Sequence, residues 1–359
     1  SLTHTNTHTH TLTQPLRVDS MLKKCLVQRS ARVKSIHFHD KEPWVLCGLY
    51  NGELQIWNFE TKQLIKTFSV VELPIRTAKF VPRKQWVICG SDDMVIRVFN
   101  YNTMEKITEF EAHTDYIRYI EVHPTLPYFL STSDDLQIKC WDWSKKFTNV
   151  RTYDGHVHYV MMVRFNPKDP AYFASASLDK TVKMWCLTAP DPNFTLEGHN
   201  QGVNCVAFMP SGDRPFLVSG SDDLTVKVWD YQTKACVHTL KGHEKNVSCV
   251  DFHPTLPLII SGSEDCTIRM WHSVTYRCET TLNYGMERVW SVGSMETTNM
   301  IGIGYDEGTV IVKIGNDTPV MSMDRQGKLL WSKNNDIVSA TLKGVAKAAM
   351  KQAEQTPNP

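Results

Sequence analysis

The segment Ser219-Gly-Ser-Asp-Asp-Leu-Thr-Val-Lys-Val-Trp229 decides the fold, because its pattern recurs along the whole chain. Two small residues precede a turn Asp, here Asp223, and an aromatic residue follows that Asp six positions later. Equivalent positions lie 42 to 44 residues apart, the length of one four-stranded blade of a β-propeller. The chain is therefore predicted to be all-β, a seven-bladed propeller. The seven positions are Trp57, Phe99, Trp141, Trp185, Trp229, Trp271 and Lys313.

Two further patterns support this prediction. Stretches such as 203–208 and 267–271 alternate with the period of two that a half-buried strand needs. Gly-His or Ala-His pairs precede several of the innermost strands and, with the repeated Trp, resemble WD repeats. The pairs are Ala112-His113, Gly155-His156, Gly198-His199 and Gly242-His243. This resemblance implies a seven-bladed WD-repeat β-propeller in which His199, Ser221, Asp223 and Trp229 form a buried hydrogen-bond chain.

A set of His, Asp and Ser also occurs in catalytic triads, but recurrence in several blades favours a structural polar network. The chain is therefore predicted not to be an enzyme. Blades one, two and seven depart from the pattern, since Asn51 replaces the turn Asp and Lys313 the Trp, while Arg29-Ser30 and Glu72-Leu73 replace Gly-His. Closure of the ring requires the chain ends to share a blade. Residues 16–18 and 22–27 are predicted to supply an outer strand beside Val310.

Three regions follow from the period. Residues 1–14 are a Thr- and His-rich stretch predicted to be a disordered extension. Residues 15–325 are predicted to form the propeller. Residues 326–359 are predicted to be a linker leading to a short helical tail at about 341–354.

Composition narrows the function classes. The 39 basic and 38 acidic residues nearly balance, so no overall field draws the chain onto nucleic acid. There is neither an apolar run long enough to span a membrane nor an apolar signal-peptide core. Five cysteines stand singly within apolar runs and predict reduced thiols in a cytosolic protein, while no cluster has metal-ligand spacing. We expect no cofactor and no metal site. The five are Cys47, Cys89, Cys140, Cys205 and Cys249.

The residues that vary between blades point to a recognition surface at one end of the channel. Immediately before the turn Asp lies what we call the pre-turn ring, which is acidic at five of its seven positions. Basic residues crowd into the first strands of blades one to three. A face split between cations and an acidic arc suits a peptide whose carboxylate and basic side chains lie a few residues apart. Two plainer explanations remain, since Asp-Asp suits a tight turn and charges also serve as solvated surface. The pre-turn ring is Tyr50, Asp92, Asp134, Leu178, Asp222, Glu264 and Asp306.

Several stretches outside the repeat pattern resemble the N-terminal propeller of the coatomer β′ family, across about residues 15–331. The resemblance implies a cargo-recognition propeller of the COPI coat that binds C-terminal dilysine signals (KKxx and KxKxx) of membrane proteins for Golgi-to-ER transport. The stretches include Glu42-Pro-Trp-Val-Leu, Phe99-Asn-Tyr-Asn-Thr, Glu111-Ala-His-Thr-Asp-Tyr-Ile-Arg, Phe165-Asn-Pro-Lys-Asp and Leu282-Asn-Tyr-Gly-Met-Glu-Arg-Val-Trp.

Site residues follow from the same resemblance, position by position. It implies that Arg32, Lys34 and Arg76 bind the peptide carboxylate, with Arg118 as a further candidate. It implies that Asp115, Asp134 and Asp222, beside Tyr50, bind the lysines. The implied partners are dilysine cargo tails and, through a longer subunit, the α and ε coatomer subunits. The implied location is the cytosolic face of Golgi membranes and COPI vesicles. An alternative is a structural scaffold for coat assembly that joins partners through the sides of the blades and does not recognise the signal.

Overall fold

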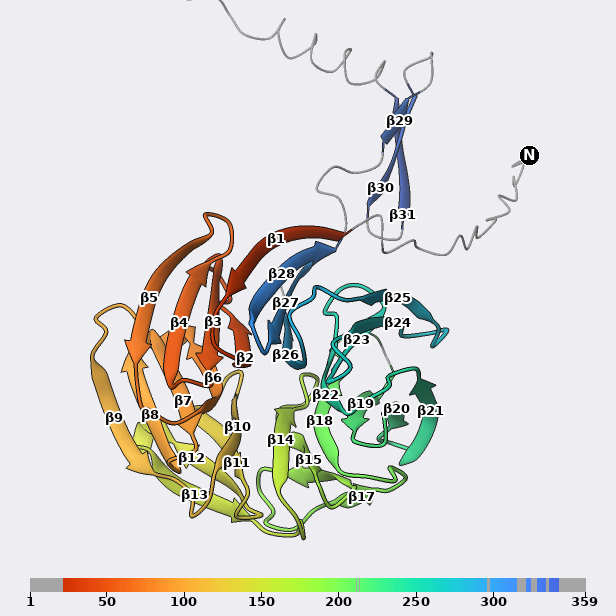
Figure 1. Ribbon diagram of the computed structural model, residues 1–359. Helices are drawn as coiled ribbons and strands as arrows, with labels where there is room; N and C mark the ends of the chain where they lie inside the picture. Colours follow the sequence, from red (N-terminus) through yellow and green to blue (C-terminus); the bar gives the residue numbers. More distant parts are fainter. Residues whose placement is uncertain are drawn as a thin grey trace, which may run out of the picture. The chain divides into compact units, whose positions relative to one another are not determined.

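A computed structural model describes residues 22–210, 212, 214–295 and 298–314, and the backbone alone of residues 321–323, 328–333 and 336–341. The chain divides into two compact units, residues 1–314 and 315–359. In the first unit, seven antiparallel four-stranded sheets stand around a central axis, and the first strand of each blade lies innermost (Figure 1). The predicted seven-bladed propeller is confirmed.

Blades one to three follow the chain from the axis outward, with all neighbouring strands antiparallel. Short 3-10 turns at Pro82–Lys84 and Trp143–Lys145 join strands in blades two and three. Blade one comprises β2 Val33–Phe38, β3 Trp44–Leu49, β4 Glu53–Asn58 and β5 Gln63–Ser69. Blade two comprises β6 Ile75–Val81, β7 Trp86–Ser91, β8 Val95–Asn100 and β9 Lys106–Glu111. Blade three comprises β10 Ile117–Val122, β11 Tyr128–Ser133, β12 Ile138–Asp142 and β13 Thr148–Tyr153.

Blades four to six repeat this order, except that the outer strand of blade four is only three residues long. Blade four comprises β14 Val160–Phe165, β15 Tyr172–Ser177, β16 Val182–Cys186 and β17 Phe194–Leu196. Blade five comprises β18 Val203–Phe208, β19 Phe216–Ser221, β20 Thr225–Asp230 and β21 Ala235–Lys241. Blade six comprises β22 Val247–Phe252, β23 Leu258–Ser263, β24 Ile268–His272 and β25 Cys278–Leu282.

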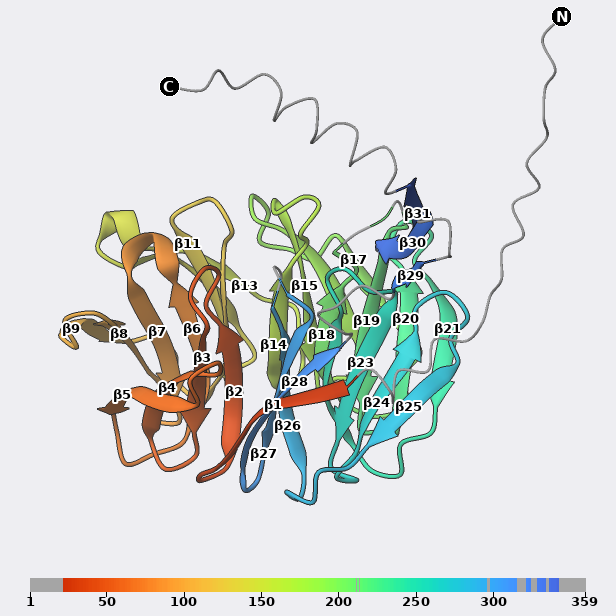
Figure 2. The same cartoon turned by 90° about the horizontal axis from the view of Figure 1, so that it is seen from above.

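Blade seven closes the ring with strands from both ends of the unit, in the order β1-β28-β27-β26. The outer strand β1 pairs with β28 from Leu22 opposite Ile314 to Arg29 opposite Gly308, and both views show the two side by side (Figures 1 and 2). The predicted closure is confirmed for its described part, whereas residues 16–18 lie outside the described residues. The strands are β1 Leu22–Arg29, β26 Val289–Ser294, β27 Met300–Tyr305 and β28 Gly308–Ile314.

Apolar side chains fill the space between neighbouring blades. The second strand of each blade is almost fully buried, because it has a blade neighbour on both faces. The small residues of the repeated Ser-Gly-Ser segment permit this close packing. A Cβ on Gly220 would lie 2.6 Å from Val247 Cγ1 of the next blade. Five cysteines are free and buried among these strands, as predicted: Cys47, Cys89, Cys140, Cys205 and Cys249.

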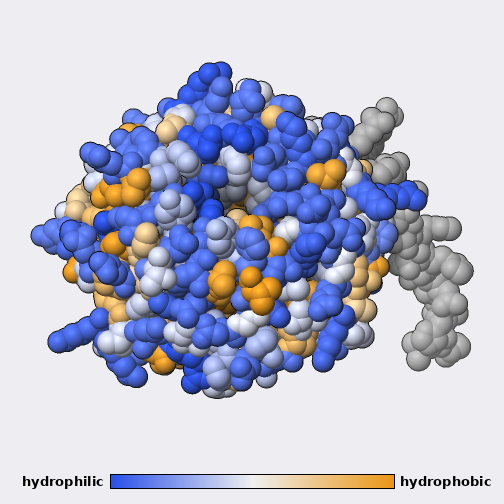
Figure 3. All heavy atoms as spheres, turned by 60° about the horizontal axis from the view of Figure 1, so that its bottom comes forward, coloured by the Kyte–Doolittle hydropathy of each residue, from blue (hydrophilic) through white to orange (hydrophobic). Residues whose placement is uncertain are grey.

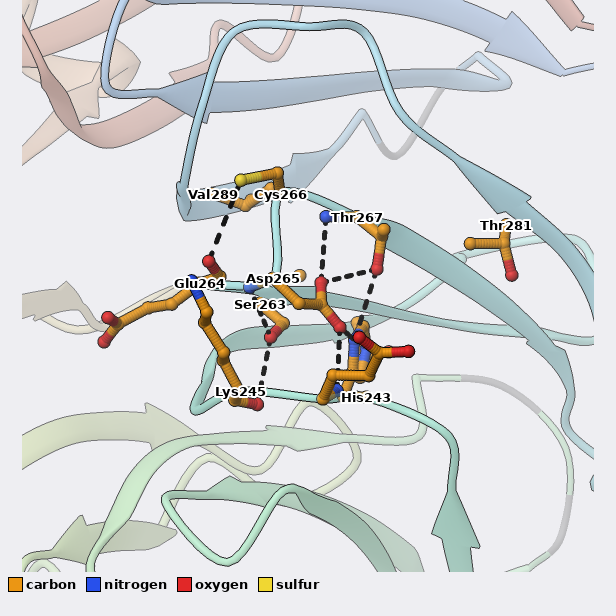
Figure 4. A network of polar contacts seen from close by, with 12 residues as sticks. His243, Lys245, Ser263, Glu264, Asp265, Cys266, Thr267, Thr281 and Val289 are labelled. Atoms are coloured by element: carbon orange, nitrogen blue, oxygen red, sulfur yellow. Dashed lines mark hydrogen bonds and ion pairs between the residues drawn. The ribbon is translucent and has the colours of Figure 1, made fainter.

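A buried polar network links the strands within each of blades three to six. In blade five, His199 bonds to Asp223 at 2.8 Å and to Ser219 Oγ at 2.7 Å, and Trp229 Nε1 donates to the same Oγ at 2.8 Å. Equivalent bonds recur in the other three blades, and Figure 4 shows His243 and Asp265 in blade six. The polar network is thus structural.

The predicted serine of this network was wrong. Ser219, and not Ser221, joins His199 to Trp229. The two serines share a face of β19 because side chains alternate along a strand. Only the deeper one reaches the indole and imidazole nitrogens. Ser221 supports the turn instead, since its Oγ accepts from Asp223 N at 3.1 Å and donates to Gln201 O at 3.2 Å.

The second unit contains a small antiparallel sheet in the order β29-β30-β31. Its strands are β29 Met321–Met323, β30 Lys328–Lys333 and β31 Asp336–Thr341. The sequence patterns did not predict this sheet, and the last propeller strand, β28, ends at Ile314. The expected helix at 341–354 overlaps β31 at Thr341 and otherwise lies outside the described residues, as does the expected disorder of residues 1–14. In the described part of the chain, no helix is long and apolar enough to cross a membrane.

Candidate peptide-binding site

The innermost strand of every blade is irregular at one equivalent position. Pairing with the second strand shifts by one residue there, as between Val33 and Ser35 in blade one. A β-bulge of this kind leaves one residue out of the ladder and redirects its side chain. All seven of these residues line one cavity of about 440 Å³. We call them the bulge ring: Lys34, Arg76, Arg118, Met161, Asn204, Ser248 and Trp290.

Two arginines of the bulge ring are held by acids of the pre-turn ring in their own blades. Arg76 donates from Nε and Nη2 to the two carboxylate oxygens of Asp92 at 2.6 and 2.7 Å. Arg118 forms the same bidentate pair with Asp134, and its Nε bond is 2.6 Å long. Such bidentate pairs fix the guanidinium plane. Each arginine therefore lines the cavity in a defined orientation.

Asp306, the pre-turn acid of blade seven, also holds arginines in place. Its carboxylate accepts from Arg32 Nε, from Arg288 Nε at 2.8 Å and from Trp290 Nε1 at 2.7 Å. The Trp290 indole in turn lies close to three cations, with Arg32 at 5.4 Å and Lys34 at 3.1 Å from its ring centroid and Arg288 at 5.0 Å. This aromatic platform and its carboxylate thus gather cations from blades one and seven.

Lys34 lies among these cations. Within the described residues, it forms no ion pair with a carboxylate. Burial, followed by the positive charges of Arg76 and Arg32, lowers the pKa of the Lys34 ammonium to about 6, although Asp306 acts in the opposite direction. A carboxylate placed between Lys34, Arg32 and Arg76 would supply the missing negative charge. This sector therefore has the electrostatics of an anion-binding site.

The other sectors of the cavity differ in character. Blade four contributes Met161 and Leu178, the apolar members of its two rings. Blades five and six contribute Asn204, Asp222 and Glu264 together with two further polar residues. A space-filling view shows one face of the ring as mainly hydrophilic and hollowed at its centre, with apolar residues grouped on one side of the hollow (Figure 3).

Six of the eight sequence-predicted site residues line this cavity: Arg32, Lys34, Tyr50, Arg76, Arg118 and Asp222. Asp134 and Asp115 do not. Asp134 is occupied by Arg118, and Asp115 Oδ1 accepts from the backbone N–H of Tyr116 at 2.7 Å. Four of the five acids of the predicted wide acidic arc form ion pairs with arginines at this end of the ring, and among the described residues Asp222 is the one that does not.

The sequence patterns located the acids that hold these arginines but did not predict the ion pairs between them, nor the roles of Trp290 and Asn204. One signal was present, because an arginine at the bulge position and an acid at the pre-turn position occur together in blades two and three. A cation and an acid brought to the same end of one sheet are expected to pair. Among the described residues, no group of three or more His, Cys, Asp or Glu is placed to hold a metal ion.

The fold and the repeated polar networks define a class, the β-propellers built from WD-type blades. The WD domain, G-beta repeat model matches residues 62–100, 104–142, 147–186, 190–230 and 234–272, and the chain belongs to this family. Each match begins at or just before the outer strand of one blade and ends in the third strand of the next. The first and last repeats are not matched, consistent with Ser30 and Asn51 at the His and Asp positions of the first and Lys313 at the Trp position of the last.

Three curated proteins similar to this chain are coatomer β′ subunits. Coatomer subunit beta'-2 of Oryza sativa subsp. japonica is 66% identical over 331 residues, covering 92% of this chain and 36% of the rice protein. Coatomer subunit beta' of Homo sapiens is 60% identical over 343 residues, covering 96% and 38%. Coatomer subunit beta'-1 of Arabidopsis thaliana is 57% identical, covering 96% and 37%. The chain thus spans little more than a third of these relatives, and the resemblance to coatomer β′ propellers is confirmed.

Proposed function

We propose that the chain is the cargo-recognition propeller of a COPI coat and that its cavity binds C-terminal dilysine signals of membrane proteins. The observation that carries this proposal is the arrangement of unmatched charge in one cavity. Lys34 lies among arginines without an acid of its own, while Asp222 on the same cavity has no cation partner among the described residues. A peptide carrying a terminal carboxylate and a lysine a few residues upstream complements both.

The site's own ion pairs support a ligand of this kind. Arg32 and Arg76 are fixed by Asp306 and Asp92, so little side-chain freedom is lost when a carboxylate binds. The Tyr50 ring, whose centroid lies 4.8 Å from the Arg32 guanidinium, is 40% exposed and able to contact a lysine stem. Charge-assisted contacts at this partly open site favour reversible binding.

The names of the relatives support the wider context. They are subunits of coatomer, so we propose that the longer protein joins other coatomer subunits, α and ε among them, on the cytosolic face of Golgi membranes and COPI vesicles. Propellers of the WD-repeat family serve as binding platforms, and we propose no enzymatic step. A scaffold that binds partners only through the sides of its blades would leave the cavity charges without a ligand.

Titration of a fluorescent dilysine peptide, as free acid and as C-terminal amide, tests the proposal. We expect the free acid to bind about tenfold or more tightly, because amidation removes a charge-assisted contact. Arg32→Ala is expected to weaken the free acid by a similar factor, and the difference between the two peptides is expected to vanish largely when Arg32, Lys34 and Arg76 are all neutralised. Arg29→Ala is the matched control, since that side chain is 78% exposed and not part of the cavity lining. Equal binding of acid and amide by the folded wild type would refute the proposal.

A further inference from the structure

Blade five differs from blades two and three at the point where the two rings meet. In blades two and three an arginine of the bulge ring occupies both oxygens of the pre-turn acid. In blade five the bulge residue is Asn204, and its Nδ2 donates to Asp222 Oδ1 at 2.7 Å and to Val247 O at 3.1 Å. Among the described residues, nothing bonds to Asp222 Oδ2. One carboxylate oxygen thus remains open to the cavity.

An apolar wall lies beside this open oxygen. A Cβ placed on Gly202 would lie 3.3 Å from Asp222 Oδ2 and 2.6 Å from Leu178 Cδ2. The glycine therefore marks a point that both groups flank, and Leu178 and Asp222 line the same cavity. An apolar surface next to a single carboxylate oxygen matches a lysine side chain, which has a methylene stem and a compact charged end.

We propose that Asn204 makes the blade-five subsite selective for lysine over arginine. A guanidinium binds a carboxylate best through two parallel bonds that need both oxygens, as Asp92 and Asp134 demonstrate in this molecule. Because Asn204 already donates to Oδ1, only Oδ2 of Asp222 is wholly free. An ammonium needs that oxygen alone, whereas a guanidinium fork would have to share Oδ1 with the Asn204 amide. Leu178 contacts the lysine stem, and Asn204 is a positioning residue that acts through Asp222. This inference rests on the proposed function, because it concerns the same cavity.

Competition between matched peptides tests the inference. The peptides are a free-acid dilysine peptide and two derivatives in which one lysine at a time is replaced by arginine. For the wild type we expect an arginine at one of the two positions to weaken binding about five- to tenfold. Asn204→Ala is expected to reduce that preference to about twofold or less, since both oxygens of Asp222 become available. Asn200→Ala is the matched control, an exposed asparagine shortly before β18 that is not part of the cavity lining.

A second variant places an arginine at the bulge position of blade five, as in blades two and three. Asn204→Arg is expected to form a bidentate pair with Asp222 and to weaken the dilysine peptide about tenfold, while the ratio between free acid and amide stays unchanged. Thermal melting of each variant establishes that it is folded. If Asn204→Ala weakens lysine and arginine peptides equally, or if the wild type does not distinguish them, the inference is overturned. A different result would refute the proposed function itself, namely equal binding of the free-acid and amide peptides by the wild type.

Discussion

The polar networks of blades three to six and the charged rings around the cavity are made from similar residue types in different settings. Each network repeats the same four residue types, as in His199, Ser219, Asp223 and Trp229, and its side chains are almost completely buried. The rings change from blade to blade and several members stay partly exposed, with side-chain exposures of 18% for Arg76 and 26% for Glu264. Repetition with burial indicates a role in stability, whereas variation with exposure indicates recognition.

The pKa shifts follow the same division. Burial lowers the pKa of His156, although its bond to Asp179 opposes that shift. Burial acts to raise the pKa of Asp223, but hydrogen bonds from His199 and Thr225 hold it well below its usual range. These partners satisfy each other's charge. At the cavity, by contrast, Lys34 is the group whose charged form lacks a partner, which is the condition expected before a ligand arrives.

The largest expected effect comes from breaking a buried network. Trp229 is 1% exposed and packs in the core between neighbouring blades, so Trp229→Ala is expected to lower the free energy of unfolding by about 3–5 kcal/mol. Denaturant unfolding measures this change. Trp57→Ala is the control, because Trp57 is only partly buried and its Nε1 bonds to Gln55 instead of a network serine. An equal loss in both variants would contradict the special role of the network.

A smaller effect separates the two serines of β19. Ser219→Ala leaves the buried His199 Nε2 and Trp229 Nε1 without their hydrogen-bond partner, at a cost of about 2–4 kcal/mol in the free energy of unfolding. Ser221→Ala removes only the turn contacts to Asp223 N and Gln201 O, and about 1 kcal/mol is expected. Unfolding curves of the two variants measure the difference. A larger loss for Ser221→Ala than for Ser219→Ala would instead support Ser221 as the network serine, as the sequence resemblance implied.

The smallest expected effect is a change of peptide affinity with pH, and it does not concern the stability of the fold. Burial and the neighbouring arginines place the pKa of Lys34 at about 6, and a bound carboxylate would raise it. The complex then holds more protons than the free protein above pH 6, so affinity falls as pH rises. From pH 6 to pH 8 we expect about fivefold weaker binding of the free-acid peptide. Lys34→Met should flatten this dependence, and an unchanged slope in that variant would assign the titration to another group.

Much of the fold was predictable because a repeat reports the same structure seven times. The spacing of Trp57, Trp141 and Trp229 predicted the blades, and the apolar pattern of residues 22–27 predicted the closing strand. The sheet at 321–341 was not predictable in this way. It occurs once, so no second copy distinguishes a short strand from a linker.

The sequence predicted which charged residues lie at the cavity, but it did not predict which of them form ion pairs with each other. Arg76 and Arg118 were expected at the cavity, and the structure places them there. Asp134 was expected to be available for a ligand, yet Arg118 occupies it. The pairing depends on side-chain reach across one sheet, and the order of residues in the chain does not report that distance.

The sequence by itself determined the blade number, the closure and the residue types that surround the channel, because these follow from periodicity and strand alternation. Only the tertiary structure decided which charges remain available. A bulge in each innermost strand turns one residue per blade toward the same cavity. There, arginines and acids from the same or adjoining blades neutralise each other wherever they meet, and Lys34 and Asp222 are left for a ligand.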